Sequence, residues 1–133
     1  MRRGDTFLIK EAGLDTHLWI ITSCPLRDPS RVLCLNVTTF DSRNPSKDPA
    51  CILVRTDHPF LTKDESCIHY AGAKLLSLDD LIRWKQTKLI EMREPMSEEI
   101  MGRIYCGAET SCRMSLEHAE ILEFQRFILN DDF

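Results

Sequence analysis

The sequence lacks any apolar run long enough to cross a membrane, since nowhere in its 133 residues do about 18 apolar side chains follow one another. It also lacks a cationic excess, because its net charge is −4. Summed Lys and Arg charge is what holds a protein broadly to nucleic acid or anionic membrane, so only a local basic groove would do so here. Charged residues follow Met1 at once, which predicts no signal peptide and a soluble, cytoplasmic protein without membrane partners.

The cysteines lack the spacing of a metal or redox site. No Cys-x-x-Cys pair occurs among the six, which are Cys24, Cys34, Cys51, Cys67, Cys106 and Cys112. Most lie inside apolar runs, and in a reducing compartment such thiols are free and buried. A zinc site built from Cys67, His69, Cys106 and Cys112 would lack tight ligand spacing, so we expect no metal and no cofactor.

The positions of individual thiols predict their reactivity. Cys34 and Cys51 fall within apolar runs that read as central strands, and a buried thiol is protonated and inert. Cys24 precedes Pro25 at a strand end, and Cys112 lies in a turn beside Arg113. Cys24 and Cys112 are therefore expected to react first with an alkylating reagent.

The chain also lacks repeats, a linker and low-complexity segments. With 43% apolar residues, it reads as a single domain over residues 1–133, long enough to bury a core. The most polar and proline-broken segment is SRNPSKDP, residues 42–49, which is expected to form a long mobile loop.

Short apolar runs broken by Gly, Pro, Asp and Asn fill the first part of the chain and predict strands. The candidate strands are residues 5–10, 17–23, 31–40, 50–55, 66–71 and 73–77, with one more at 89–93. Helical patterns come later, at residues 78–86, 97–110 and 115–128. Strands first and helices second predict an α+β domain, in which a small SH3-like antiparallel β-barrel is flanked by C-terminal helices.

Serines mark the starts of the predicted helices. Ser77 and Asp80 fit a capping box, Ser97 is followed by two acids, and Ser115 fits the cap of the last helix. The last helix is rich in apolar residues and is expected to bury a face that contains Leu116, Ala119, Leu122, Phe124 and Phe127.

Taken in order, these pieces resemble the MazF/PemK (Kid) family of toxins from bacterial toxin–antitoxin pairs. The opening GDTFLI resembles the first strand of that family, HLWIITS resembles its second, and LNVTT resembles the strand that carries a catalytic threonine. SCIHYAGAKLLSLDDL and MSEEIMGRIYCGAE resemble later stretches, so the likeness would cover nearly the whole chain.

The resemblance implies a homodimeric, metal-independent endoribonuclease that cuts single-stranded RNA and is held by an antitoxin protein. Thr38 matches the family's threonine, which makes it a candidate catalytic residue. The family's Arg-Pro pair falls on Thr16-His17 here, so the arginine is missing. Neither Thr nor neutral His offers the charged, two-pronged contact to phosphate that a guanidinium does.

Imidazoles are the candidates to take over the chemistry, because a histidine is the usual protein base and acid near pH 7. His17 lies beside the vacant position, and His58 lies in the tetrapeptide Asp57-His58-Pro59-Phe60. That tetrapeptide also fits a plain turn, with an Asx hydrogen bond at Asp57 and Phe60 at the core edge. The candidate substrate-binding residues are Thr16, Thr39, Arg55, Asp57, His69 and Tyr70.

Two other functions remain open on the sequence. The missing arginine and the acidic balance favour a non-catalytic module of the same fold, as in the CcdB toxins, which grip another protein. The third reading is an inactive homologue kept for protein contacts. In strand 66–71, His69 and Tyr70 alternate, so either could stack a base or form part of a packing pair.

Overall fold

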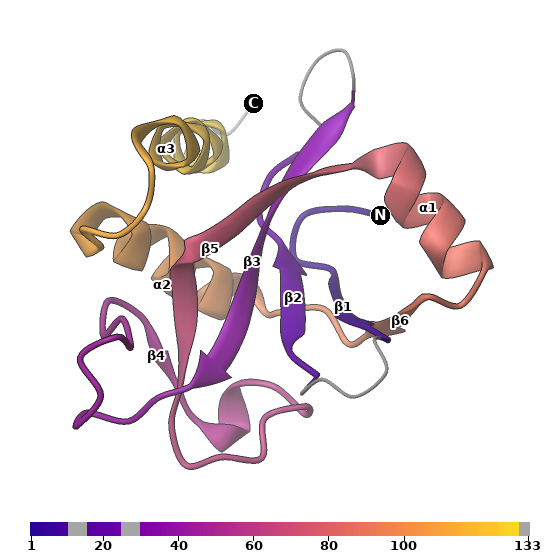
Figure 1. Cartoon of the computed structure of the whole chain (residues 1–133). Coiled ribbons are helices and arrows are strands. Elements are labelled where there is room, and N and C mark those ends of the chain that lie inside the picture. Colours follow the sequence, from indigo (N-terminus) through magenta and orange to yellow (C-terminus); the bar gives the residue numbers. More distant parts are fainter. Residues whose placement is uncertain (11–15, 25–29, 131–133) are drawn as a thin grey trace.

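A computed structural model describes residues 1–10, 16–24 and 30–130, and the side chains of the last helix as far as Gln125. Within this part of the chain, six antiparallel strands form one sheet and three α-helices pack around it (Figure 1). The strands are β1 (Thr6–Ile9), β2 (Leu18–Ile21), β3 (Arg31–Thr39), β4 (Ile52–Leu53), β5 (Ser66–Ser77) and β6 (Ile90–Arg93). The helices are α1 (Leu78–Gln86), α2 (Glu98–Thr110) and α3 (Leu116–Asn130), with a 3-10 turn η1 at Arg55–Asp57. The expected α+β class is confirmed.

The sheet is ordered β4-β5-β3-β2-β1-β6 and curls into a half-barrel. Much of the curl comes from β5, which the sequence predicts as two strands, 66–71 and 73–77. The two are one strand with an irregular register, because Asn36 pairs with His69 while Cys34 pairs with Lys74. The surplus residues on β5 bend the strand, as bulges do, and Figure 1 shows the resulting corner.

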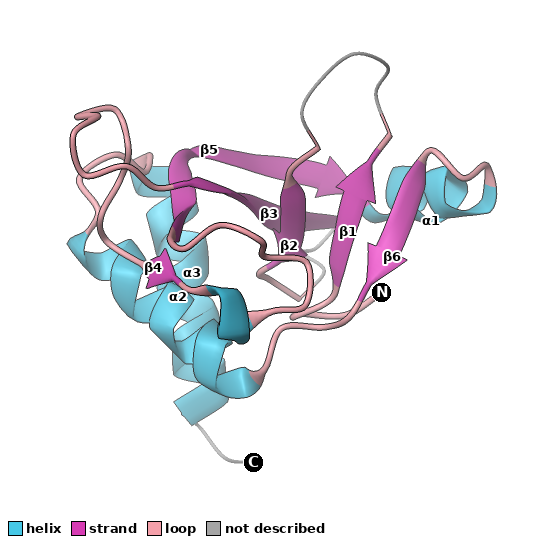
Figure 2. Ribbon diagram, turned by 90° about the horizontal axis from the view of Figure 1, so that it is seen from below, coloured by secondary structure: helices cyan, strands magenta, loops and turns pink. Residues whose placement is uncertain are grey.

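Both faces of the sheet are covered, as the nearly continuous apolar run of β3 predicts. One face carries Leu33, Leu35 and Val37 and packs against α2 and α3. The other carries Val32 and Cys34 and packs against Leu81 of α1. Figure 2 shows α2 and α3 together on one side and α1 beside β6 at the far end.

The serine caps form where the sequence predicts them. The Ser77 hydroxyl accepts a hydrogen bond from the Asp80 amide, and Ser97 and Ser115 do the same for Ile100 and His118. The capping box is not completed, because the Asp80 carboxylate instead pairs with Arg83. No helix in the described part of the chain is both long and apolar enough to span a membrane.

The last helix buries less of its apolar side than the sequence suggests. Leu122 is fully buried, but Leu116 and Phe124 are 75% and 58% exposed. The prediction that all five apolar residues face the core is wrong for these two, and the side chain of Phe127 lies outside the described residues. Leu116 and Phe124 therefore leave two exposed apolar side chains on α3.

The cysteines divide into two groups that give a chemical test of the core. Cys34, Cys51 and Cys67 are buried, and burial raises the pKa of Cys34 to about 12 and that of Cys51 to about 11. Cys24, Cys106 and Cys112 are exposed free thiols. We expect brief native iodoacetamide treatment to label these exposed thiols first and the buried ones only after unfolding, as read by mass spectrometry. Early labelling of Cys34 would contradict the packing of β3.

Candidate functional site

A cleft of about 360 Å³ opens where the beginning of β2, the end of β3 and the beginning of β5 meet the loop 58–65. It contains four of the residues that the sequence singles out: Thr16, His17, Thr38 and Thr39. The remaining lining residues are Val37, Phe60, Leu61, Thr62, Lys63 and Ser66. The cleft therefore has a largely hydroxyl-rich wall with one imidazole and one ammonium group.

His17 is held in one tautomer by the backbone. Its Nδ1 lies 3.2 Å from the carbonyl oxygen of Val37. A carbonyl oxygen only accepts hydrogen bonds, so Nδ1 carries the proton in the neutral ring and donates it there. This leaves the lone pair on Nε2, and the exposed His17 side chain presents a proton acceptor at the cleft.

Thr38 is joined to a cation that the sequence does not point to. The Lys47 ammonium donates a hydrogen bond of 3.2 Å to the Thr38 hydroxyl oxygen. Lys47 lies in the segment 42–49, which is expected to be mobile but is fastened at several points. Arg113 donates to the carbonyl oxygens of Pro45 and Ser46, and the buried Asp48 carboxylate accepts from the Ser111 hydroxyl.

A row of polar side chains continues from the cleft across one face of the sheet. Asn36 lies opposite both Trp19 and His69, and residues directly opposite each other share a face. The Asn36 Oδ1 is buried without a hydrogen-bond partner in the described part of the chain. The His69 ring lies over Gly72, where even a β-carbon would overlap it. His69 thus extends the polar site beyond the lining of the cleft.

The protonation of His69 is shifted by its surroundings. Desolvation lowers the pKa of His69, and the nearby Lys47, His17 and Arg113 lower it further against the opposing effect of Asp48. The neutral ring is therefore the dominant form at pH 7. His69 is a neutral imidazole beside two fixed cations, an arrangement suited to hydrogen bonding with an anionic or polar ligand.

This shift gives a pH dependence of stability. A lowered pKa means that the unfolded chain binds the proton more readily, so stability is fully present above about pH 6.5 and falls as the pH drops through the lowered pKa. In urea unfolding, we expect His69→Gln to lose less stability than the wild type when the pH is lowered from 7.5 to 5. His118→Gln on α3 serves as the matched control. An unchanged pH dependence in His69→Gln would contradict the shift.

His58 is placed as a structural residue. It is only 2% exposed, its Nε2 donates to the Glu94 carbonyl oxygen at 2.6 Å, and its Nδ1 accepts from the Phe60 amide at 3.1 Å. Both nitrogens are occupied, so His58 has none left to exchange a proton with a substrate, and we leave it out of the proposed site. The turn interpretation of this tetrapeptide fits the geometry, and Phe60 packs against the core.

Three further candidate residues lie outside the cleft lining. Arg55 pairs with Asp64, and Asp57 pairs with Arg103. The Asp57 carboxylate also accepts from the amide of Val54, which precedes it in the chain, whereas an Asx turn would use the amide of a later residue. Tyr70 is buried, and its hydroxyl donates to the Ile104 carbonyl oxygen at 2.6 Å. Tyr70 therefore belongs to the core face of β5, whereas His69 belongs to the polar face.

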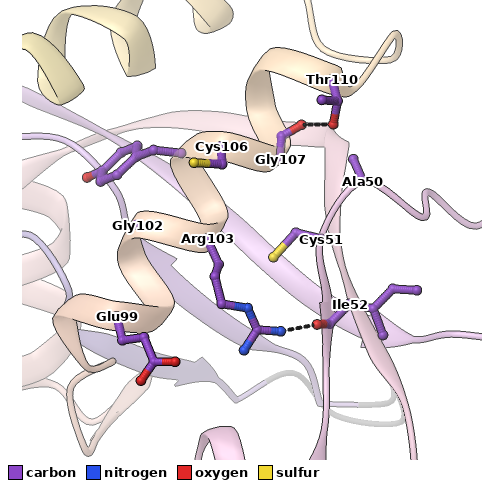
Figure 3. A pocket seen from close by; sticks show the side chains of 10 residues that line it. Ala50, Cys51, Ile52, Glu99, Gly102, Arg103, Cys106, Gly107 and Thr110 are labelled. Carbon is purple, nitrogen blue, oxygen red and sulfur yellow. Dashed lines mark hydrogen bonds between the residues drawn. The ribbon is translucent and has the colours of Figure 1, made fainter.

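A larger groove of about 730 Å³ runs along α2, on the side that faces β4. In Figure 3, Arg103 extends from α2 across this groove and bonds the Ile52 carbonyl oxygen at 2.5 Å. The groove is lined mainly by small or apolar groups, and its guanidinium is already engaged with Ile52 and Asp57. Its lining also includes the Glu99 carboxylate and the exposed Cys106 thiol, and no histidine is among the described residues that line it.

Sequence reasoning singled out His17 and Thr38 but not Lys47, which is nine residues from Thr38 in a polar segment without periodicity. The described residues hold no group of three or more His, Cys, Asp or Glu side chains arranged to bind a metal ion. No family model matches the sequence, and no curated protein or solved structure shows significant similarity to it.

Proposed function

We propose that this chain is a toxin-like, metal-independent endoribonuclease of single-stranded RNA, with a half-barrel of the SH3-like MazF/PemK type. The observation that supports this most is the cleft that gathers Thr16, His17, Thr38 and Thr39. Thr16, His17 and Thr38 stand at the positions that the resemblance makes catalytic, and they come from the residues before β2 and from the end of β3. The antitoxin partner, the homodimer and the cytoplasmic location belong to the same proposal.

The chemistry would use the RNA's own 2′-hydroxyl as the nucleophile. The Nε2 atom of His17 takes the proton from that hydroxyl as the O2′–P bond forms and the P–O5′ bond breaks. The Thr38 hydroxyl donates to a phosphate oxygen, and the leaving O5′ takes a proton from solvent in the open cleft. The products are a 2′,3′-cyclic phosphate and a 5′-hydroxyl end.

Cell-free cleavage tests this proposal. The purified chain is expected to cut single-stranded RNA in the presence of EDTA and to leave cyclic phosphate and 5′-hydroxyl ends. A 2′-deoxy substitution at the cut position should block the reaction because it removes the nucleophile. Induction in a bacterium, with growth measured and new RNA 5′ ends mapped, shows whether the same cuts occur in cells.

A second candidate function is a binding toxin that acts by protein contact. The apolar groove along α2 and the exposed Leu116 and Phe124 favour it, since apolar surface of this kind is typical of interfaces. Growth arrest without RNA cuts would support this function over cleavage. Light scattering that returns about 15.4 kDa at tens of micromolar would remove the homodimer.

A further inference from the structure

Lys47 is not among the residues that line the cleft, but its ammonium is held against one of them more firmly than that of Lys63, the lysine of the lining. The side chain of Lys47 is half-buried and its ammonium donates to the Thr38 hydroxyl, whereas Lys63 is exposed at the rim. An ammonium that already contacts a candidate catalytic hydroxyl can reach a phosphate oxygen bound at the same point. Two of its three hydrogens remain for that contact.

The segment that carries Lys47 is fixed on both sides of it by the turn between α2 and α3. On the N-terminal side, the Arg113 guanidinium donates to the carbonyl oxygens of Pro45 at 2.8 Å and Ser46 at 2.7 Å. On the C-terminal side, Asp48 is 4% exposed, accepts from the Ser111 hydroxyl at 2.6 Å and accepts from the Ala50 amide at 3.0 Å. The residues that flank Lys47 therefore cannot shift without breaking hydrogen bonds to this turn.

We infer that Lys47 is the phosphate-binding cation of the cleft and that Arg113 is a positioning residue that holds it against Thr38. This inference rests on the proposed function, and it names the group that binds the anionic substrate in a chain that has no arginine at the resembling position. Figure 1 shows the arrangement of these elements: the loop between β3 and β4 passes beside the end of α2, where the turn to α3 begins.

The geometry also explains why Arg113 acts through Lys47. The two terminal nitrogens of the Arg113 guanidinium each donate to a backbone carbonyl oxygen. A lysine cannot make both contacts in this geometry, because its ammonium lacks the planar fork of a guanidinium. Loss of Arg113 would release Pro45 and Ser46 and let Lys47 leave Thr38. Arg113→Lys should therefore behave like Arg113→Ala, although it keeps the charge.

The test uses the full chain and a fluorescein-labelled, single-stranded 2′-fluoro oligonucleotide of mixed sequence, which has no 2′-hydroxyl and is not cut. Binding is measured by anisotropy over a series of salt concentrations. Lys47→Ala should bind about tenfold more weakly, since it loses a charge-assisted hydrogen bond. The slope of log affinity against log salt should fall by about 0.7, the value for one contact to a single strand. Lys47→Arg should keep most of the affinity and most of the salt slope. Lys85→Ala on α1 is the matched control and should change neither.

Arg113→Ala and Arg113→Lys should each reduce the salt slope by the contribution of Lys47. Combining Arg113→Ala with Lys47→Ala should reduce the slope no further than Lys47→Ala alone. Thermal melting of each variant shows that it is folded. In the same proteins, NMR measurement of the pKa of His69 reports whether Lys47 is in place in the absence of RNA, because Lys47 is one cause of the lowered pKa of His69. That pKa should rise in Lys47→Ala. It should rise in Arg113→Lys as well, where the new lysine keeps a cation at position 113 and Arg113 itself is the smallest of the causes.

The possible results distinguish a wrong assignment of Lys47 and Arg113 from a wrong proposed function. Normal binding by Lys47→Ala, with wild-type cleavage intact, overturns the assignment of Lys47 and leaves the nuclease proposal standing. Full activity and an unchanged His69 titration in Arg113→Lys overturn the positioning role. A wild-type chain that binds no oligonucleotide overturns both the phosphate site and the proposed nuclease.

Discussion

Replacing His17 with alanine is expected to lower the rate of RNA cleavage about 10²- to 10⁴-fold, the usual contribution of a general base. The Nδ1 atom of His17 is bound to the Val37 carbonyl, so the reactive lone pair is on Nε2. His17 is exposed and its loss should leave the core intact. Single-turnover cleavage of a labelled RNA at saturating enzyme measures the chemical step, and melting by circular dichroism checks the fold.

The matched control for this prediction is His118→Ala. His118 lies on α3, outside the lining of the cleft, so its replacement should leave cleavage unchanged. A further check is the pH profile of the cleavage rate, since a general base acts only in its unprotonated form. If His17→Ala cleaves as fast as wild type, or if its pH profile is unchanged, His17 is not the base.

The helices could be located from local chemistry alone. Ser77 and Ser97 are the N-cap residues of α1 and α2, and in both cases the serine hydroxyl accepts a hydrogen bond from a backbone amide that the first turn leaves free. The bend in β5 could not be predicted, because its position depends on the pairing of Asn36 with His69 and of Cys34 with Lys74. Those contacts are between residues far apart in the sequence and carry no local signal.

The amphipathic pattern of α3 overestimated burial for a related reason. Apolar residues at helical spacing mark a face, but how much of that face is covered depends on the neighbouring element. The core reaches Leu122 and leaves Leu116 and Phe124 exposed. The pattern thus predicts the helix correctly and does not predict which apolar residues remain available for other contacts.

The candidate site was predicted in part. The resemblance pointed to Thr38 and to the vacant position at Thr16-His17, and the structure places these residues in one cleft. His58 and Tyr70 have residue types suited to chemistry or stacking, yet backbone carbonyl and amide groups occupy their polar atoms. A sequence shows that a side chain can donate a proton, but only the fold shows whether another group already accepts it.

The polar segment that carries Lys47 has contacts that its composition does not indicate. Its proline-rich and charged composition is typical of mobile loops, and composition alone gives no sign of partners. It has hydrogen bonds to Ser111 and Arg113, more than sixty residues away along the chain, in addition to local ones. A long-range clamp of this kind is visible only once the α2–α3 turn has been placed beside the loop.

The effect of adding one methyl group to α2 should depend strongly on which glycine receives it. Gly107→Ala is expected to lower the free energy of unfolding by about 1–3 kcal/mol, the usual cost of overpacking a core. A β-carbon at Gly107 would overlap the Tyr70 hydroxyl and lie 2.9 Å from the Cys51 Cβ. Cys51 Cβ is fixed to the backbone next to β4, so the strain cannot be relieved by a rotamer change.

Gly102→Ala is the matched control on the same helix, because nothing lies within 4 Å of a β-carbon there. It should raise stability by about 0.5–1 kcal/mol through the better helix propensity of alanine. Urea unfolding of both variants measures the difference, and equal stabilities would contradict the close packing of α2 on β4 and β5. Tyr70→Phe completes the test: its hydroxyl donates to the Ile104 carbonyl oxygen, so its loss should cost about 1 kcal/mol in wild type. In the Gly107→Ala background, Tyr70→Phe also removes the hydroxyl that overlaps the new β-carbon. Tyr70→Phe should therefore cost less stability there, or restore it. The effects of the two substitutions on the free energy of unfolding should be coupled rather than additive.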